Sequence, residues 1–293
     1  AGTAMAFSIR KQQQLGVLWK ASFVKVLQRC WWLFFWGVLN YAVETDRTLS
    51  FELWNVLTQL SVTTLIAFLV FDWSYRSQVW ACLGLLVLTE GLYRFTNVQG
   101  FDQPFTNLHN FGNYMDLVLM NKVNGDGWVA INVIPTAVHT IAGAMTGRWL
   151  LDNRTLKPVI VIAILTMATG YALHFSGITP IIKRIATSSF TLVTTGWCLL
   201  GMVLAYWWID IRKHQKHLSF FTIVGMNSLF IYLFFEIVGS RWFNGYVAVI
   251  AHNVLGWIST PETLSNILTS LIIFALEWYM CYFLYTRKVF IKL

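Results

Sequence analysis

Charged side chains are scarce in this chain of 293 residues: they occupy 12% of the positions, whereas apolar residues occupy 57%. A soluble domain usually has about 25% charged residues, so the composition excludes an ordinary soluble protein. The formal net charge of +8 does not indicate nucleic-acid binding, because the basic residues stand in short segments between apolar runs. That arrangement is typical of the cytoplasmic loops of membrane proteins.

Cysteine is also rare and follows no functional pattern. Cys30, Cys82, Cys198 and Cys281 lie in or beside apolar stretches, without the spacing of a disulfide framework, a zinc site or a haem attachment site. The chain has no Gly-rich phosphate loop, no Ser-His-Asp order and no cluster of metal ligands. We therefore expect four buried thiols and no bound metal.

What the sequence does contain is a series of long apolar stretches, most of them close to the roughly 20 residues that cross a bilayer. We predict an all-α, polytopic membrane bundle of about nine or ten spans, forming a single domain over residues 1–293. Residues 96–127 are predicted to be an extracytoplasmic loop with a short helix at Asn113–Met120, and residues 244–258 an interfacial or re-entrant piece. The predicted spans are 22–43, 51–71, 78–95, 130–151, 158–176, 187–210, 218–239 and 263–286.

The ends of the predicted spans differ in charge. Ala1–Ser8 reads as the end of a membrane helix, so we expect at least one more helix upstream. If that end is cytoplasmic, the positive-inside rule is satisfied, and the C-terminus lies in the cytoplasm, as in a protein of the bacterial inner membrane. Only six of the 21 basic residues then face the other side: Arg47, Arg94, Lys122, Lys183, Arg184 and Arg241.

Polar side chains inside the apolar stretches are candidate functional residues, because they are costly at membrane depth. On an α-helix over 218–239, Asn227, Ser228, Tyr232 and Glu236 share one broad face. That face either lines a site or forms hydrogen bonds between helices.

Two histidines and two sets of cations are further candidates. His174, at the outer end of its span, is an acid–base candidate, whereas we expect His139 to be a packed, hydrogen-bonded side chain. Lys183, in the outer loop after His174, either anchors lipid, caps a helix or contacts a substrate. The inner cations suit a phosphate-bearing ligand or lipid head groups.

Three segments carry a family resemblance: Pro180–Leu192, Gly225–Tyr232 followed by Glu236, and Ala275–Leu293. In them the chain resembles the heparan-α-glucosaminide N-acetyltransferase family, which includes bacterial NagX-like proteins. Weaker similarity extends over most of the chain.

The resemblance implies a transmembrane acyltransferase that moves an acetyl group from cytoplasmic acetyl-CoA to the amine of a glucosamine-type sugar on the other side. The family's essential histidine is expected upstream of Ala1. The chain departs from the family at Thr58-Gln59 and at Phe235. The residues that we assign to this activity are Glu236 and His174 for catalysis, Asn227, Ser228, Arg29, Lys288 and Lys292 for acetyl-CoA, and Lys183 and Asp116 for the acceptor sugar.

The sequence is compatible with two other functions. One is a secondary transporter of a sugar or amino sugar, which broken helices at mid-membrane would favour. The other is a membrane scaffold without catalytic activity. A homodimer is compatible with the many aromatic residues, and membrane lipid is an expected partner.

Overall fold

The computed structural model describes residues 1–42, 50–257 and 261–291, and all regular structure in these ranges is helical. The predicted all-α class is therefore confirmed. The chain forms two compact units, Ala1–Lys213 and His214–Leu293.

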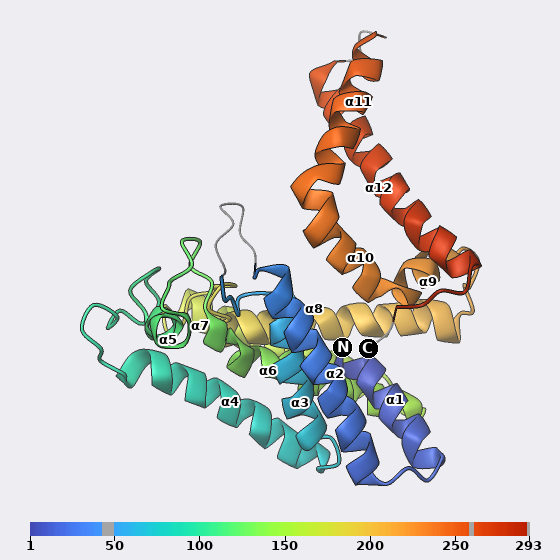
Figure 1. Ribbon diagram of the computed structural model, residues 1–293. Helices are drawn as coiled ribbons and strands as arrows, with labels where there is room; N and C mark the ends of the chain where they lie inside the picture. Colours follow the sequence, from blue (N-terminus) through green and yellow to red (C-terminus); the bar gives the residue numbers. More distant parts are fainter. Residues whose placement is uncertain (43–49, 258–260, 292–293) are drawn as a thin grey trace. The chain divides into compact units, whose positions relative to one another are not determined.

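The first unit is built around α6 (Val133–Leu151), which packs against four helices on different sides (Figure 1). A 3₁₀ turn, η1 (Ala130–Asn132), precedes α6, and a π-helical turn, η2 (Trp207–Ile211), follows the last helix. The other helices of this unit are α1 (Gly2–Gln14), α2 (Trp19–Asn40), α3 (Val56–Leu69), α4 (Tyr75–Phe95), α5 (Phe111–Met120), α7 (Lys157–Phe175) and α8 (Ser188–Tyr206).

Local sequence explains where several of these helices begin. Asn55, Ser74 and Asn110 precede α3, α4 and α5, and each side-chain oxygen accepts a hydrogen bond from the backbone N–H three residues on. These bonds satisfy N–H groups that have no partner inside a helix. Pro158 stands in the first turn of α7, where its missing N–H costs nothing.

Helices α7 and α8 pack closely because small residues stand at their contact. A Cβ atom at Gly196 would lie 2.3 Å from Met167 Cγ and 2.5 Å from the Ala163 carbonyl oxygen. Small residues are a common solution for helix contacts in membranes, where the lipid tails are as apolar as the side chains.

Polar contacts gather at two ends of the first unit. At one end, here the Arg10 end, Gln13 Nε2 donates to Asp72 Oδ1 at 3.2 Å, and Arg10 lies 3.5 Å from Asp152 Oδ1. These contacts join the C-terminal ends of α1 and α6 to the connection between α3 and α4. The predicted alternation places all these segments on the same side.

The other end, here the Lys122 end, groups the remaining connections. Lys122 Nζ lies 2.8 Å from Glu52 Oε1, and an Arg94 nitrogen donates to Thr179 Oγ1 at 3.0 Å. The segment before α3, the segment after α5, the end of α4 and the loop between α7 and α8 thus meet. The side of a membrane that each end faces stays a prediction.

The second unit is a broken helix paired with a straight one. The broken helix comprises α9 (Ser219–Met226), α10 (Ser228–Phe234), the π-helical turn η3 (Phe235–Phe243) and α11 (Asn244–Trp257). The straight helix α12 (Glu262–Thr286) packs along α11 and contacts α9, where the Trp278 ring stacks on Phe220 at 5.3 Å.

The number of membrane spans differs from the prediction. By length and composition, three helices of the described residues can cross a membrane: α7, Ser188–Ile211 and α12. The pair Ser219–Met226 and Ser228–Trp257, bent by 71°, makes a fourth if it counts as one span. The fold fits a helical membrane protein, but the prediction of nine or ten spans was wrong.

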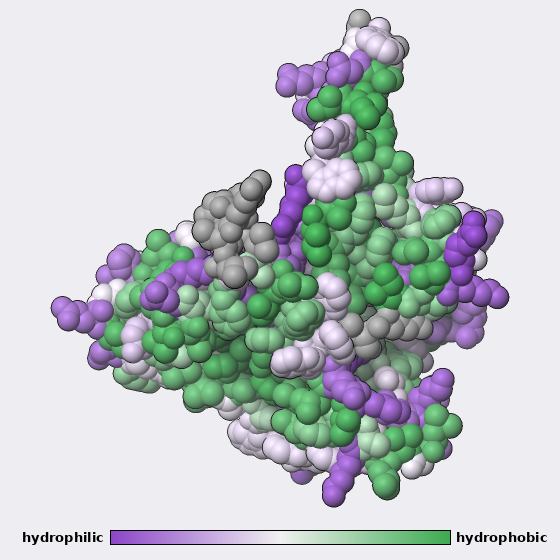
Figure 2. All heavy atoms as spheres, in the orientation of Figure 1, coloured by the Kyte–Doolittle hydropathy of each residue, from purple (hydrophilic) through white to green (hydrophobic). Residues whose placement is uncertain are grey.

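The other predicted spans do form helices, and their composition explains the difference. Helix α3 has 14 residues, which is shorter than a bilayer requires. Helix α2 carries Lys20, Lys25 and Arg29, and α6 carries Arg148 beside several threonines. We infer that these charged and polar residues lower the mean hydropathy of α2 and α6 below that of a membrane span. Hydrophobic residues nevertheless cover much of the face shown in Figure 2.

Candidate functional site

The candidate site lies at the Lys122 end, where the short helix α5 turns polar side chains inward. The helix confirms the predicted helix at Asn113–Met120. Asn113 and Asp116, one turn apart on the same face, are each 0% exposed. Gly112 permits this close packing, because a Cβ there would lie 2.3 Å from the Tyr93 hydroxyl oxygen and 2.7 Å from Val129 Cγ1.

Asp116 is a buried carboxyl of which only one oxygen accepts a hydrogen bond. Its Oδ1 accepts the Ala130 N–H at 2.8 Å, whereas its Oδ2 is buried without a partner among the described residues. Burial raises the pKa of this carboxyl from about 3.8 to about 7, and the bond from Ala130 opposes part of that shift. An acid with a pKa near 7 exchanges protons readily at physiological pH.

Three other polar groups near α5 are also buried without a hydrogen-bond partner among the described residues. They are the Tyr93 hydroxyl, both amide atoms of Asn113 and the Trp54 indole N–H. The Trp54 N–H is close enough to lower the pKa of Asp116 slightly, but it makes no hydrogen bond of standard geometry. Because unsatisfied buried polar groups are rare in folded proteins, this concentration marks a candidate ligand site.

The neighbouring carboxylates at the Lys122 end already have cations. Glu52 pairs with Lys122 at 2.8 Å, and Glu90 pairs with Arg94 at 2.8 Å. No such ion pair is found for Asp116 in the described ranges. Of these three acids, Asp116 is therefore the one that an added cationic group would satisfy.

A chain of polar contacts continues from this end along α6. Gln59 Nε2 donates to Asn132 Oδ1 at 3.0 Å, and two turns further on, His139 Nε2 lies 2.8 Å from Thr194 Oγ1 on α8. The hydrogen bond and the half-buried position of His139 agree with a packed, structural histidine.

The structure places the other predicted residues of the first unit as follows. Lys183 is exposed, and its Nζ lies 5.4 Å from the centre of the Trp128 ring, two residues before the Asp116 contact at Ala130. His174 is exposed, and its Nδ1 accepts the Ile181 N–H at 3.3 Å. Arg29 is exposed on α2. Lys183 and His174 thus lie at the Lys122 end, whereas Arg29 does not belong to that group of contacts.

In the second unit, Asn227 occupies the break between α9 and α10 and is 0% exposed. Its Nδ2 donates to the Val289 carbonyl at 3.2 Å, and its Oδ1 accepts the Ile291 N–H at 3.1 Å. These bonds tie the break to the C-terminal segment. The two bonds fit the alternative of a structural amide, and the assignment of Asn227 to acetyl-CoA stays a prediction.

The predicted polar face of residues 218–239 depends on an unbroken α-helix. The structure instead has a break at Asn227 and a π-helical turn that contains Glu236, so the spacing of 3.6 residues per turn does not hold along the segment. Ser228 is exposed and Glu236 is half-buried. Lys288 is exposed at the end of α12, and Lys292 lies outside the described residues.

Several members of the candidate site were not predicted from the sequence: Trp54, Tyr93, Asn113 and the pair Gln59–Asn132. Asn113 was detectable, because it stands one turn before Asp116 in a predicted helix. No sequence pattern connects Trp54 or Tyr93 with Asp116, because each lies in a different apolar or aromatic segment far from residue 116 in the chain. No metal-binding group of three or more His, Cys, Asp or Glu side chains occurs within residues 1–42, 50–257 and 261–291.

Comparisons with known proteins add no independent identification. No family model matches the chain, and no curated protein is significantly similar to it.

Proposed function

We propose that the chain belongs to a membrane acyltransferase that acetylates the amine of an amino sugar with acetyl-CoA as donor, and that Asp116 receives that amine. Two kinds of support lead to this proposal. The sequence resembles the heparan-α-glucosaminide N-acetyltransferase family, and the Lys122 end contains a buried carboxyl without a cation.

The observation that supports this proposal most directly is that Asp116 Oδ2 is buried without a hydrogen-bond partner among the described residues. A protonated sugar amine would supply both the missing hydrogen bond and the missing charge. Charge-assisted hydrogen bonds of this kind are stronger than neutral ones. The nearby Asn113 amide and Trp54 indole N–H offer further bonds to sugar hydroxyl groups.

The acid–base chemistry balances with Asp116 as the base. The ammonium group gives one proton to the Asp116 carboxylate, and the freed lone pair attacks the thioester carbonyl carbon. A C–N bond forms, the C–S bond breaks, and the second amine proton passes to the leaving thiolate. The products are the N-acetyl sugar, the free thiol of CoA and protonated Asp116.

Access to Asp116 requires movement, because its side chain is fully covered. Its neighbours include Ala130, whose N–H donates a hydrogen bond to it, and Trp54 and Tyr93, which lie close enough to interact electrostatically with it. Local opening of a short helix or loop is a common step in substrate binding.

The test is acetyl transfer from labelled acetyl-CoA to glucosamine by the protein in proteoliposomes. Asp116→Asn keeps the shape and the bond from Ala130 but removes the base, so we expect kcat to fall about a hundredfold or more. The matched control is Asp126→Asn, which removes an exposed carboxylate in the same loop region and should leave kcat unchanged.

Two outcomes would refute the proposal: an absence of acetyl transfer by the intact protein, or equal kcat for the wild type and Asp116→Asn. The melting temperature of each variant shows whether a loss of activity reflects unfolding.

A secondary transporter is the second candidate, and the broken helix favours it. Half-helices that meet at a bend often form transporter binding sites, and α9 and α10 meet in this way at Asn227. Glucosamine uptake into proteoliposomes without acetyl-CoA distinguishes the two: uptake without acetylation supports the transporter, whereas acetylation without net uptake of free sugar supports the enzyme.

A further inference from the structure

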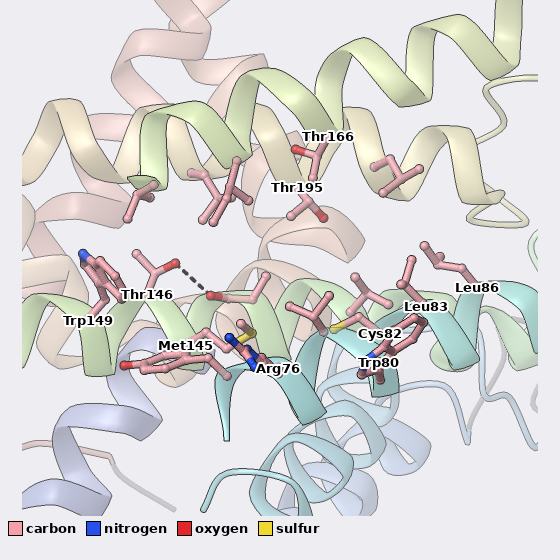
Figure 3. A pocket seen from close by; sticks show the side chains of 18 residues that line it. Arg76, Trp80, Cys82, Leu83, Leu86, Met145, Thr146, Trp149, Thr166 and Thr195 are labelled. Atoms are coloured by element: carbon pink, nitrogen blue, oxygen red, sulfur yellow. Dashed lines mark hydrogen bonds between the residues drawn. The ribbon is translucent and has the colours of Figure 1, made fainter. Parts of the chain in front are cut away.

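A cavity of about 500 Å³ lies in the first unit among α4, α6, α7 and α8, away from α5. Figure 3 shows Thr166 and Thr195 on one side of it, and Trp80, Cys82 and Leu83 on the other. This volume is within the range of roughly 300–1,000 Å³ that is typical of small-molecule sites.

The body of the cavity is apolar and offers few hydrogen bonds. Thr146 and Thr166 line it, but their hydroxyl groups already donate to the Ala142 and Ala163 carbonyls at 2.8 and 2.9 Å. Thr195 Oγ1 has no partner among the described residues. A sugar or a nucleotide would lose its hydrogen bonds with water here without replacement, whereas a hydrocarbon chain loses nothing.

One end of the cavity is cationic and aromatic. Arg76 is the only charged residue among those that line the cavity, and Figure 3 shows it between Trp149 and Leu86. It follows Tyr75, whose ring centre lies 5.7 Å from that of Trp149 at one end of the cavity. Arg76 is exposed, and no ion pair is found for it in the described ranges. Its guanidinium is free to bind an anion.

Two more guanidinium groups stand at this end. Arg148 Cζ lies 4.8 Å from the centre of the Tyr75 ring, and Arg154 Cζ lies 4.9 Å from that of Trp149. Two acids lie at the same end: Asp152, which pairs with Arg154 at 3.3 Å and with Arg10 at 3.5 Å, and Asp72, which lines a smaller cavity together with Arg148. Four cations (Arg10, Arg76, Arg148 and Arg154) against these two acids leave a positive rim.

The combination has the form of a lipid site. Tyr and Trp are enriched at the level of lipid head groups, and basic pockets between membrane helices bind anionic head groups. The apolar part cannot select a lipid by itself, because lipid tails are as apolar as the lining. Selection therefore depends on the charge of the head group.

We propose that this cavity binds one acyl chain of an anionic phospholipid, with the phosphate held at Arg76 beside Tyr75 and Trp149. The positive rim complements the phosphate, and the dry interior complements the chain. The proposal does not rest on the acetyl-transfer function, because the binding involves neither acetyl-CoA nor Asp116.

The test is native mass spectrometry of the protein after equilibration with mixed micelles of phosphatidylglycerol and phosphatidylcholine in equal amounts. The wild type should retain one phosphatidylglycerol molecule in preference to phosphatidylcholine. Arg76→Gln should reduce that preference about tenfold, as expected for the loss of one charge-assisted bond. Lys11→Gln, which removes an exposed cation of α1 outside the cavity, should retain it.

A second pair of variants tests the cavity itself. Leu83 and Ile162 line it from α4 and α7, so Leu83→Trp with Ile162→Trp should abolish retention of the lipid. Val87→Trp with Val161→Trp is the control on the same two helices, because those side chains are 70% and 54% exposed and do not line the cavity.

Three results would overturn the proposal. The first is equal retention of the two lipids by the wild type, and the second is unchanged lipid retention in the variant that fills the cavity. The third is that the wild type is a dimer and the cavity-filling variant a monomer, with the same oligomeric state whether or not lipid is added. The last result would show that a second copy of the chain, rather than a lipid, covers the cavity.

Discussion

The buried amide and carboxyl side chains of this protein fall into two groups, those with all polar atoms hydrogen-bonded and those with unpaired atoms. Both polar atoms of the Asn227 side chain bond to the backbone near the C-terminus, whereas Asp116 keeps one oxygen and Asn113 keeps both amide atoms without partners. A satisfied buried polar group stabilises one arrangement of the chain, and an unsatisfied one costs about 1–3 kcal/mol. That cost is tolerable where a ligand later supplies the bond.

The raised pKa of Asp116 predicts a specific dependence of stability on pH. The folded protein holds this proton up to about pH 7, whereas an unfolded chain releases it near pH 4. Between these values the folded state binds more protons, so stability falls as pH rises. A shift of this size corresponds to at most about 4 kcal/mol.

We expect the melting temperature of the wild type in detergent to fall between pH 5 and pH 8, and that of Asp116→Asn to fall much less. Asp126→Asn should keep the decline of the wild type. Parallel curves for the wild type and Asp116→Asn would show that this carboxyl does not titrate in that interval.

At the scale of the elements, the most informative feature is the broken helix of the second unit. Residues 219–257 have the apolar composition of a membrane span, but the chain bends by 71° around Asn227. A break frees backbone groups that a continuous helix would pair. At this point the Asn227 side chain donates one hydrogen bond to the C-terminal segment and accepts another from it. These two bonds hold the break in place.

Asn227→Ala should therefore loosen the C-terminal segment. The variant leaves the Val289 carbonyl and the Ile291 N–H without these bonds, at a cost of about 1–3 kcal/mol each if they stay buried. We expect trypsin to cut after Lys288 several times faster than in the wild type. In the control Asn253→Ala, the amide that is lost bonds only within its own helix, and the rate should not change.

This experiment also separates two roles for Asn227. If acetyl-CoA binding weakens in Asn227→Ala while cleavage after Lys288 keeps its rate, the amide contacts the donor and not the C-terminal segment. The hydrogen bonds of Asn227 predict the opposite result: faster cleavage after Lys288 and unchanged binding of acetyl-CoA.

At the scale of the whole chain, the described contacts sort the connections of the first unit into the Arg10 end and the Lys122 end. The basic residues concentrate in segments assigned to the Arg10 end. The positive-inside rule then predicts that the Arg10 end is cytoplasmic.

The orientation is testable with single cysteines in a background without the four native ones. Asp126→Cys near the Lys122 end should react with a membrane-impermeant maleimide in intact cells. Leu15→Cys, at a side chain that is 71% exposed near the Arg10 end, should react only after permeabilisation. The opposite pattern would reverse the topology of the first unit.

The sequence by itself determined the helical class, the position of most helices and the polar short helix at α5, because apolar runs and capping residues act locally. It overestimated the number of spans, since a long helix with Lys, Arg or Thr in its apolar run packs against protein as readily as it crosses lipid. Only the tertiary structure decided which polar groups are satisfied. Asn227 finds its partners more than 60 residues away. Asp116 Oδ2 is buried without a partner among the described residues, although Trp54, Tyr93 and Ala130 approach this carboxyl from other parts of the chain. The pairing of such groups depends on how helices pack, and no local pattern of residues encodes it.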